Sequence, residues 1–201
     1  MAQLFFEYGA MNSGKSIEIL KVAHNYESQG KNILLMTPAA DTRSGTGIVS
    51  SRIGLERPAV AIQKADNLFD IVKHHQTNLA AVLIDEAQFL FPEQVDQLAQ
   101  VVDELHIPAM AFGLKQDAFN QLFPGSKRLI EMADKLEEMK TICAFCGKKA
   151  ITQLRIVDGE PQREGQQVFI GGDEAYIPTC RHHWYHPDMA KISDLFPKEG
   201  K

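Results

Sequence analysis

The chain has 201 residues, of which 44% are hydrophobic, enough for one main domain with a small addition. It carries 21 Lys and Arg against 26 Asp and Glu, and the net charge of -5 argues against a broad positive surface for a nucleic-acid backbone. No apolar run approaches the ~20 residues of a membrane span, and the N-terminal residues lack the features of a signal peptide. We therefore expect a cytoplasmic protein that binds neither nucleic acid nor membrane.

Apolar runs alternate with amphipathic stretches over the first two thirds of the chain, which predicts βα units around a mostly parallel sheet. In chain order the expected strands are residues 4–8, 33–36, 80–84 and 109–112. The expected helices run from Gly14 to about Gly30 and over residues 68–74, 95–105 and 126–139. Residues 41–57 are rich in Gly, Ser and Arg, which predicts a long loop that is mobile without a ligand.

From Lys140 the pattern changes to short β-like pieces, residues 151–157 and 167–170, separated by Gly, Pro, Asp and Glu. From Pro187 the chain has little to bury. We therefore expect an α/β domain over residues 1–139, a smaller domain over 140–190 and a flexible tail over 191–201.

The segment after the first strand matches the phosphate-binding pattern G-x-x-x-x-G-K-[ST] in full. It consists of Gly9, Ala10, Met11, Asn12, Ser13, Gly14, Lys15 and Ser16. In such a loop, backbone N–H groups and the helix N-terminus point at phosphate oxygens. Lys15 is expected to reach the β- and γ-phosphates of ATP, and the Ser16 hydroxyl to ligate Mg²⁺. A glycine-containing turn that carries Lys and Ser by chance is the alternative, and a full match makes it rare.

Two carboxylates, Asp85 and Glu86, follow the apolar strand at residues 80–84, where ligands bind in open α/β sheets. We expect Asp85 to hold Mg²⁺ or its water, Gln88 to belong to the same ATP and magnesium site, and Glu86 to orient or deprotonate the attacking oxygen. Taken alone, the two acids could simply end a strand in solvent. Helicases also carry such a pair, but the chain is too short for the two domains that a helicase needs.

Cys143 and Cys146 form one ligand pair, and Cys180 and His183 form a second pair of the same spacing. A Cys₃His set predicts a structural zinc ion with no open position for catalysis. His182 or His186 could replace His183, which we favour because its spacing mirrors the first pair. Three free cysteines and solvent-exposed histidines are the alternative.

These motifs, in this order, resemble those of the zinc-containing type II thymidine kinases, and the likeness runs from Leu4 to about His183. Asp41-Thr-Arg43 and Ile170-Gly-Gly-Asp-Glu-Ala-Tyr176 are further family-like segments. The resemblance implies an α/β P-loop NTPase fold of RecA-like type with a small zinc ribbon and a lasso-like loop. It also implies transfer of the ATP γ-phosphoryl group to the 5′-hydroxyl of thymidine, and of deoxyuridine, in nucleotide salvage.

Residue roles follow from the same resemblance. Glu86 matches the family's general base, Asp41 and Arg43 match residues near the phosphates, and Phe89 matches an aromatic of the base pocket. The segment that closes over thymine corresponds to Gln167, Val168, Phe169, Ile170 and Gly171 together with Tyr176. Ala118 stands where the family usually has an aromatic, so Phe119 is the expected base contact, and Arg52 is assigned only by its place in the loop. The resemblance further implies a homotetramer that thymidine triphosphate inhibits.

Two other functions compete with a thymidine kinase. A nucleotide-dependent regulator would use ATP to order residues 41–57 and would dock a macromolecule on the zinc ribbon. A kinase for another nucleoside would differ in its acceptor, since one methyl group discriminates by only about 1–3 kcal/mol.

Overall fold

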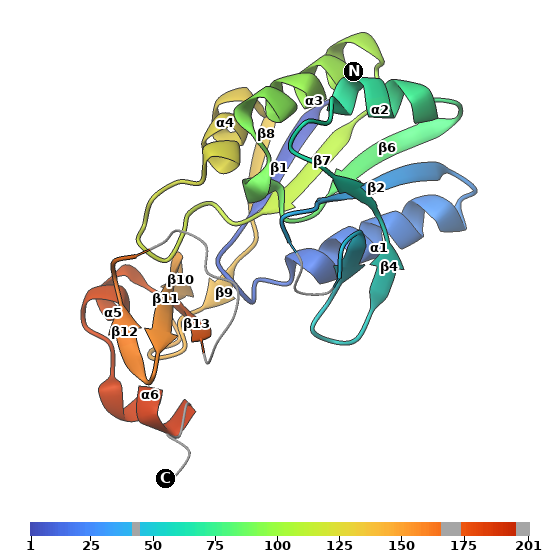
Figure 1. Ribbon diagram of the computed structural model, residues 1–201. Coiled ribbons are helices and arrows are strands. Elements are labelled where there is room, and N and C mark those ends of the chain that lie inside the picture. Colours follow the sequence, from blue (N-terminus) through green and yellow to red (C-terminus); the bar gives the residue numbers. More distant parts are fainter. Residues whose placement is uncertain (42–44, 166–173, 196–201) are drawn as a thin grey trace. The chain divides into compact units, whose positions relative to one another are not determined.

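The structure is a computed structural model that describes residues 1–41, 45–165 and 174–195 (Figure 1). Its contacts divide the chain into two compact units. Unit 1 comprises Met1–Tyr8, Gly14–Lys115 and Phe123–Met139, and unit 2 comprises Gly9–Ser13, Gln116–Leu122 and Lys140–Lys201. Two short segments from the first part of the chain thus group with the second part. The division into domains 1–139 and 140–190 with a tail over 191–201 stays a prediction.

Unit 1 is built on a six-stranded sheet of order β5-β2-β6-β7-β1-β8, in which all neighbouring strands pair in parallel. The strands are β1 Leu4–Tyr8, β2 Asn32–Pro38, β5 Val60–Ile62, β6 Leu79–Ile84, β7 Ala109–Gly113 and β8 Lys135–Glu138. The apolar runs become central strands because both faces of such a sheet are covered. The predicted mostly parallel sheet with flanking helices is confirmed.

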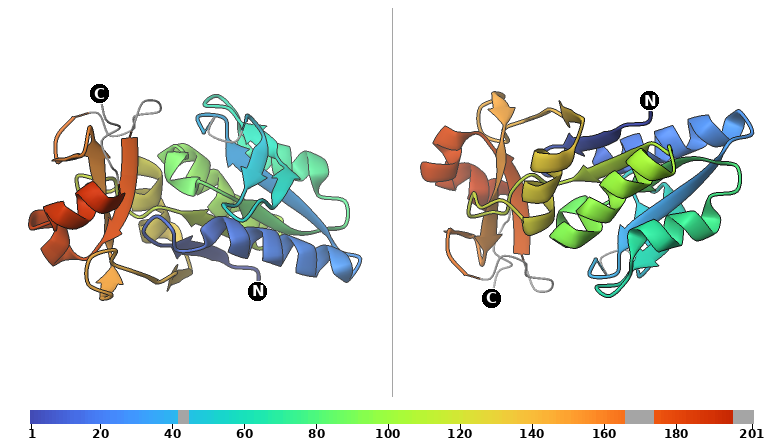
Figure 2. Two further views of the ribbon diagram at one scale, coloured as in Figure 1. Left: turned by 90° about the horizontal axis from the view of Figure 1, so that it is seen from below. Right: turned by 90° about the horizontal axis from the view of Figure 1, so that it is seen from above.

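Helices cover the two faces of this sheet, as both views in Figure 2 show for unit 1. On one face lies α1 Lys15–Ser28, whose apolar side packs on Leu83 and Phe112. On the other face lie α2 Leu68–His75, α3 Pro92–Glu104 and α4 Pro124–Met132, which share a core with Phe6 and Ile84. Alternate residues of β2, β6 and β7 supply the two cores, so the strand period of two sets both faces.

The expected long loop over residues 41–57 is wrong in its second half. There β3 Ile48–Ser50 and β4 Glu56–Pro58 form an antiparallel hairpin. Val49 is buried within the core under α1, so one apolar side chain anchors a segment whose composition predicts a loop. Residues 42–44 lie outside the described residues.

The expected helix over residues 126–139 is also wrong in its second half, because α4 ends at Met132 and β8 follows. The sequence Lys-Leu-Glu-Glu favours a helix by intrinsic propensity. Pairing with β1 outweighs that preference, since β8 completes the edge of the sheet. The Asp134 carboxylate accepts a hydrogen bond of 2.7 Å from the Leu4 N–H and fixes the chain at the start of β8.

Glu7 of β1 has an unusual environment, because it lies opposite Glu137 of β8 and near Glu18 of α1. Burial, followed by these two carboxylates, raises its pKa from 4.5 to about 7. The folded protein therefore holds this proton more tightly than the unfolded chain does. As a result, the contribution of Glu7 to stability is fully present below pH 4.5 and is lost as the pH rises from 4.5 to about 7.

We expect Glu7→Gln, which cannot ionise, to raise the free energy of unfolding by about 1 kcal/mol above pH 7, after allowance for partial exposure. The gain should shrink as the pH approaches about 5, where wild-type Glu7 is already protonated in the folded state. Urea unfolding at about pH 5 and pH 8 measures the difference. The exposed residue Glu104 serves as the control, changed to Gln. An equal gain at both pH values would contradict the assignment.

The described part of unit 2 contains two small sheets and two short helices. Its strands are β9 Thr141–Ile142, β10 Lys149–Ala150, β11 Thr152–Val157, β12 Glu160–Gln162 and β13 Glu174–Thr179, and its helices are α5 Arg181–Tyr185 and α6 Met189–Leu195. β11 pairs in antiparallel fashion with both β12 and β13. The expectation that little is buried from Pro187 on is wrong for α6, because Ile192 is fully buried. Within the described residues no helix is both long and apolar enough to cross a bilayer.

Candidate active site and metal centre

The phosphate-binding motif connects β1 to α1, the context that its sequence predicts. Gly14, with a φ of 85°, caps the helix in the left-handed conformation that glycine adopts without steric cost. Lys15 and Ser16 form the first residues of α1 in unit 1, while residues 9–13 group with unit 2. The helix N-terminus places backbone N–H groups and the positive end of the dipole beside Lys15.

Asp85 follows the last residue of β6 and is 4% exposed. Burial and then the neighbouring Glu86 raise its pKa to about 7, against the hydrogen bond that the Ser16 hydroxyl donates and the charge of Lys15. The structure thus brings the P-loop hydroxyl and the strand-end carboxylate into direct contact. A divalent cation suits these two oxygen ligands, and its charge would favour the ionised form of Asp85.

Glu86 occupies a left-handed backbone conformation with φ 49° and ψ 37°, which costs a non-glycine residue about 1–2 kcal/mol. It begins a turn that continues as a short helix, η1 Ala87–Phe89. The Glu86 N–H donates to the Asp85 carboxylate at 2.9 Å. Because of this strained turn, the two adjacent side chains point in different directions. Asp85 is buried, while Glu86 is partly exposed.

Gln88 contacts the Glu86 side chain and fixes its position. It is 1% exposed, its side-chain N–H donates to the Glu86 carboxylate, and its side-chain oxygen accepts from the Leu114 N–H at 2.9 Å. The Leu114 N–H can only donate, so the side-chain amide of Gln88 must turn its oxygen to Leu114 and its NH₂ group to Glu86. Gln88, predicted as an ATP and magnesium residue, therefore contacts the predicted base here. Its part in nucleotide binding stays a prediction.

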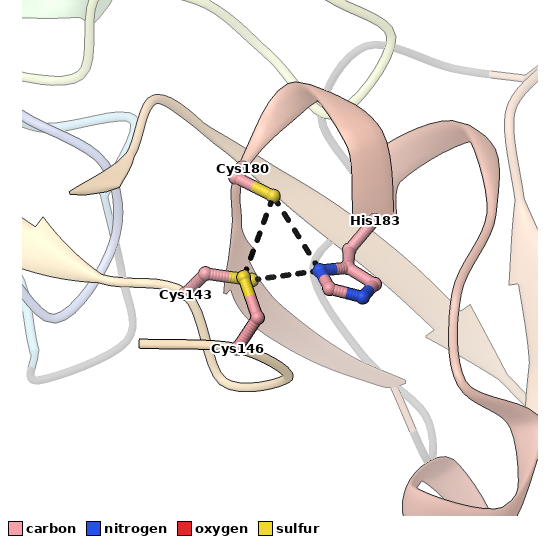
Figure 3. A group of neighbouring side chains, drawn as sticks. All are labelled: Cys143, Cys146, Cys180 and His183. Carbon is pink, nitrogen blue, oxygen red and sulfur yellow. Dashed lines mark hydrogen bonds between the residues drawn. The ribbon is translucent and has the colours of Figure 1, made fainter. Parts of the chain in front are cut away.

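Four residues of unit 2, Cys143, Cys146, Cys180 and His183, bring one ligand atom each within 4.8 Å of one another. Figure 3 shows the three thiols and Nδ1 of His183 facing one another, with Nδ1 in contact with the thiols of Cys143 and Cys180. Cys143 and Cys146 come from the β9–β10 hairpin, whereas Cys180 and His183 begin α5. Of the three histidines that the sequence left open, only His183 is in this cluster.

The distances suit a tetrahedral zinc ion. The Sγ atoms of Cys146 and Cys180 are 3.9 Å apart, and Nδ1 of His183 is 3.5 Å from Cys143 Sγ and 3.4 Å from Cys180 Sγ. Tetrahedral zinc with ordinary bond lengths separates two sulfurs by about 3.8 Å and sulfur from nitrogen by about 3.6 Å. The cluster therefore has the donor set and the spacing of a site that could hold a metal ion such as zinc.

Local electrostatics at two of the four residues favour the ligand forms. Burial raises the pKa of Cys143, but backbone donors such as the Cys180 N–H outweigh it, and the pKa lies below its usual value. Burial and then the charge of His182 lower the pKa of His183, which favours the neutral form of its ring. A backbone N–H lowers the pKa of Cys146, yet desolvation and the neighbouring thiols raise it overall. A bound cation would reverse that last effect.

A tight loop over Gln116–Leu122 belongs to unit 2. The buried carboxylate of Asp117 accepts hydrogen bonds from the N–H groups of Phe119 at 2.8 Å and Gln121 at 2.9 Å. Ala118 is 4% exposed, and Phe119 is partly exposed. The loop therefore buries the alanine that departs from the family pattern and leaves the neighbouring aromatic partly accessible.

Comparisons with known proteins agree with these features. The family model described as thymidine kinase matches residues 2–184. The chain belongs to the thymidine kinase family. Thymidine kinase of Lactiplantibacillus plantarum is 61% identical over 93% of this chain and 97% of its own length. The Enterococcus faecalis enzyme is 60% identical over 93% and 96%, and the Lactococcus lactis enzyme 58% identical over 94% and 100%.

Among solved structures, the Pif1 helicase from Candida albicans aligns with 70% of this chain and 36% of its own at a TM-score of 0.42 and 16% identity. No conclusion about this chain rests on a likeness of that size. The predicted resemblance to the thymidine kinases is confirmed by the family match and by the relatives.

The predicted thymidine and phosphate contacts divide into those that the structure describes and those that it does not. The described residues do not include Arg43 or the segment of Gln167, Val168, Phe169, Ile170 and Gly171. Phe89 is partly exposed and meets the buried Phe123 edge to face, with ring centroids 5.7 Å apart. Tyr176 lies on β13 opposite Arg155 of β11. The roles of all these residues stay predictions.

Gly125, which the sequence analysis missed, packs against the Glu86 turn. A Cβ atom at this position of α4 would lie 2.5 Å from the Leu90 carbonyl oxygen and 2.9 Å from that of Ala87. Both contacts are to backbone, which cannot rotate away. Only a comparison of homologous sequences could have singled out this glycine in advance.

We therefore expect Gly125→Ala to destabilise the protein by about 2–3 kcal/mol, although alanine is favoured over glycine by about 1 kcal/mol in a helix. Turnover should fall as well, because the displaced turn carries Glu86. Urea unfolding and initial rates measure both effects. Lys127→Ala, at an exposed position of the same helix, is the control and should change neither. A more stable Gly125→Ala protein would show that the contact relaxes without cost.

Proposed function

We propose that this protein is an ATP-dependent thymidine kinase that converts thymidine and ATP into thymidine monophosphate and ADP, with deoxyuridine as a second acceptor. The observation that carries the proposal is the contact between Ser16 of the P-loop helix and Asp85, with Glu86 next in the chain. In a member of the thymidine kinase family, this contact joins the phosphate-binding loop to an acid pair.

Nucleotide binding falls to the P-loop. We assign the backbone N–H groups of residues 9–16 and the Lys15 ammonium to the β- and γ-phosphates of ATP. Ser16 and Asp85 would hold Mg²⁺, and Asp41 and Arg43 complete the phosphate side. When bound, Mg²⁺ neutralises charge on the β- and γ-phosphate oxygens.

Glu86 is the proposed general base. Its partly exposed carboxylate would accept the proton of the thymidine 5′-hydroxyl as that oxygen bonds to the γ-phosphorus. The bond from the γ-phosphorus to the β–γ bridging oxygen breaks, and ADP leaves with that oxygen. Gln88 keeps the carboxylate in place during this step, because its amide spans Glu86 and the Leu114 backbone. The proton then passes from Glu86 to solvent.

The thymine base would contact Phe89, Phe119, Tyr176 and residues 167–171. The Cys₃His cluster would hold a structural zinc ion, since four protein ligands leave no position for a substrate. We further propose that the protein is cytoplasmic, forms a homotetramer and is inhibited by thymidine triphosphate. The homotetramer and the inhibition rest on the family resemblance, and the cytoplasmic location rests on the sequence features described above.

A coupled ADP-release assay with ATP and Mg²⁺ tests the proposed function. The acceptors are thymidine, deoxyuridine, deoxycytidine, deoxyadenosine and none. We expect release only with thymidine and deoxyuridine. Release without an acceptor would instead indicate a nucleotide-dependent regulator, and release with a different nucleoside would indicate a kinase of another specificity.

A further inference from the structure

Trp184 is the only tryptophan of the chain and directly follows His183 in α5. Its side chain is 7% exposed and packs in the core of unit 2 with Cys143 and Cys180. The indole N–H donates a buried hydrogen bond of 2.8 Å to the carbonyl oxygen of Ala118. One side chain thus connects the metal-site helix to the Gln116–Leu122 loop.

A second donor holds the same loop. The side-chain N–H of Gln153, on β11, donates to the Gln116 carbonyl oxygen at 2.5 Å, and Gln153 is 2% exposed. Gln116 and Ala118 therefore both have their carbonyl groups held from the part of unit 2 that carries the cluster. Phe119 comes directly after the second of these anchors. Its backbone direction depends on them, because an unsatisfied buried carbonyl costs about 1–3 kcal/mol.

The position of Trp184 depends in turn on α5. The backbone N–H of Trp184 donates to the Cys180 carbonyl oxygen at 3.0 Å, which ties Trp184 to the first turn of this five-residue helix. The Arg163 guanidinium lies 5.5 Å from the indole ring and donates to the carbonyl groups of Trp184 and Tyr185. So short a helix has little stability of its own in water. Ligation of Cys180 and His183 would hold its N-cap and its first turn.

We propose that Trp184 is a positioning residue. When a metal ion orders the Cys₃His site, Trp184 holds the Gln116–Leu122 loop and thereby fixes the position of Phe119. Metal occupancy therefore sets the affinity for thymidine. The proposal rests on the proposed function in one respect, the assignment of Phe119 to the base. It gives the metal site a second role besides stabilising its own fold. Ala118 makes this bond through its backbone, so the departure from the family aromatic does not prevent it.

The test is Trp184→Phe, which keeps an aromatic ring but removes the donor. We expect the KM for thymidine to rise about tenfold, the effect of one lost bond of about 1.4 kcal/mol, while kcat and the KM for ATP change less than twofold. Zinc content should stay at the wild-type value. Tyr185→Phe, next in the same helix, is the control and should leave all four quantities unchanged. An unchanged KM for thymidine in zinc-loaded Trp184→Phe would overturn the proposal.

Hydrogen exchange gives a readout that does not depend on activity. Amides of residues 116–122 should exchange faster in zinc-loaded Trp184→Phe and in chelated wild-type protein than in zinc-loaded wild type. Equal protection in all three samples would overturn the proposal even if thymidine is not the substrate. If Trp184→Phe does not fold, Arg163→Gln, at an exposed position, should raise the KM for thymidine about threefold. No change in that variant would count against the role of Trp184.

Discussion

Replacing Glu86 by glutamine should lower kcat by about 10²–10⁴-fold, the usual contribution of a general base. Glutamine has nearly the same shape, and its side-chain oxygen can still accept from Gln88, so the strained turn should persist. It cannot take a proton from the acceptor hydroxyl. The KM for ATP and the affinity for thymidine should therefore stay within about twofold, because the loss falls on the transition state alone. Initial rates and calorimetric titration measure the two quantities.

Glu93→Gln serves as the control for this variant, since Glu93 is exposed and lies in the first turn of α3. Its kinetics should match the wild type. Near-normal turnover of Glu86→Gln would show that Glu86 is not the base. A large rise in the KM for ATP would instead place Glu86 in the nucleotide site.

Replacing His183 by alanine should release the metal and destabilise unit 2. Structural zinc in small domains contributes about 10–16 kcal/mol of binding free energy, much of which is folding free energy. The loss of one of four ligands should lower zinc content from about one ion per chain to a small fraction. Protease cleavage within residues 140–195 should become rapid. Metal analysis and limited proteolysis of the full chain measure both effects.

His186→Ala is the matched control, because His186 caps the same helix but is not in the cluster. It should keep its zinc and its resistance to protease. The reverse result, with zinc lost from His186→Ala and kept by His183→Ala, would contradict the ligand assignment. This comparison also decides between histidines that the sequence alone could not distinguish.

The central strands of unit 1 were predictable because each is a short apolar run. Segments whose structure depends on distant partners were not. Residues 135–138 have helical propensity and become a strand only by pairing with β1. The β3–β4 hairpin depends on the burial of Val49 beneath α1, which a Gly- and Ser-rich sequence does not reveal.

The candidate site shows the same division. Local patterns marked the acid pair Asp85 and Glu86 and the two ligand pairs, Cys-x-x-Cys and Cys-x-x-His. The structure places the acid pair at the end of β6 and brings the two ligand pairs together in one cluster. The supporting contacts are long-range. The Gln88 amide reaches Leu114 across 26 positions, and the Trp184 indole reaches Ala118 across 66. No local pattern in the sequence marks such pairs.

The most direct test of the account is a single incubation of the protein with γ-³²P-labelled ATP, Mg²⁺ and thymidine, followed by chromatography of the products. We predict that the label moves to thymidine 5′-monophosphate in equal amount to the ADP formed, and that Glu86→Gln forms almost none. Label recovered as inorganic phosphate, at the same rate with and without thymidine, would contradict the assignment of this chain as a thymidine kinase.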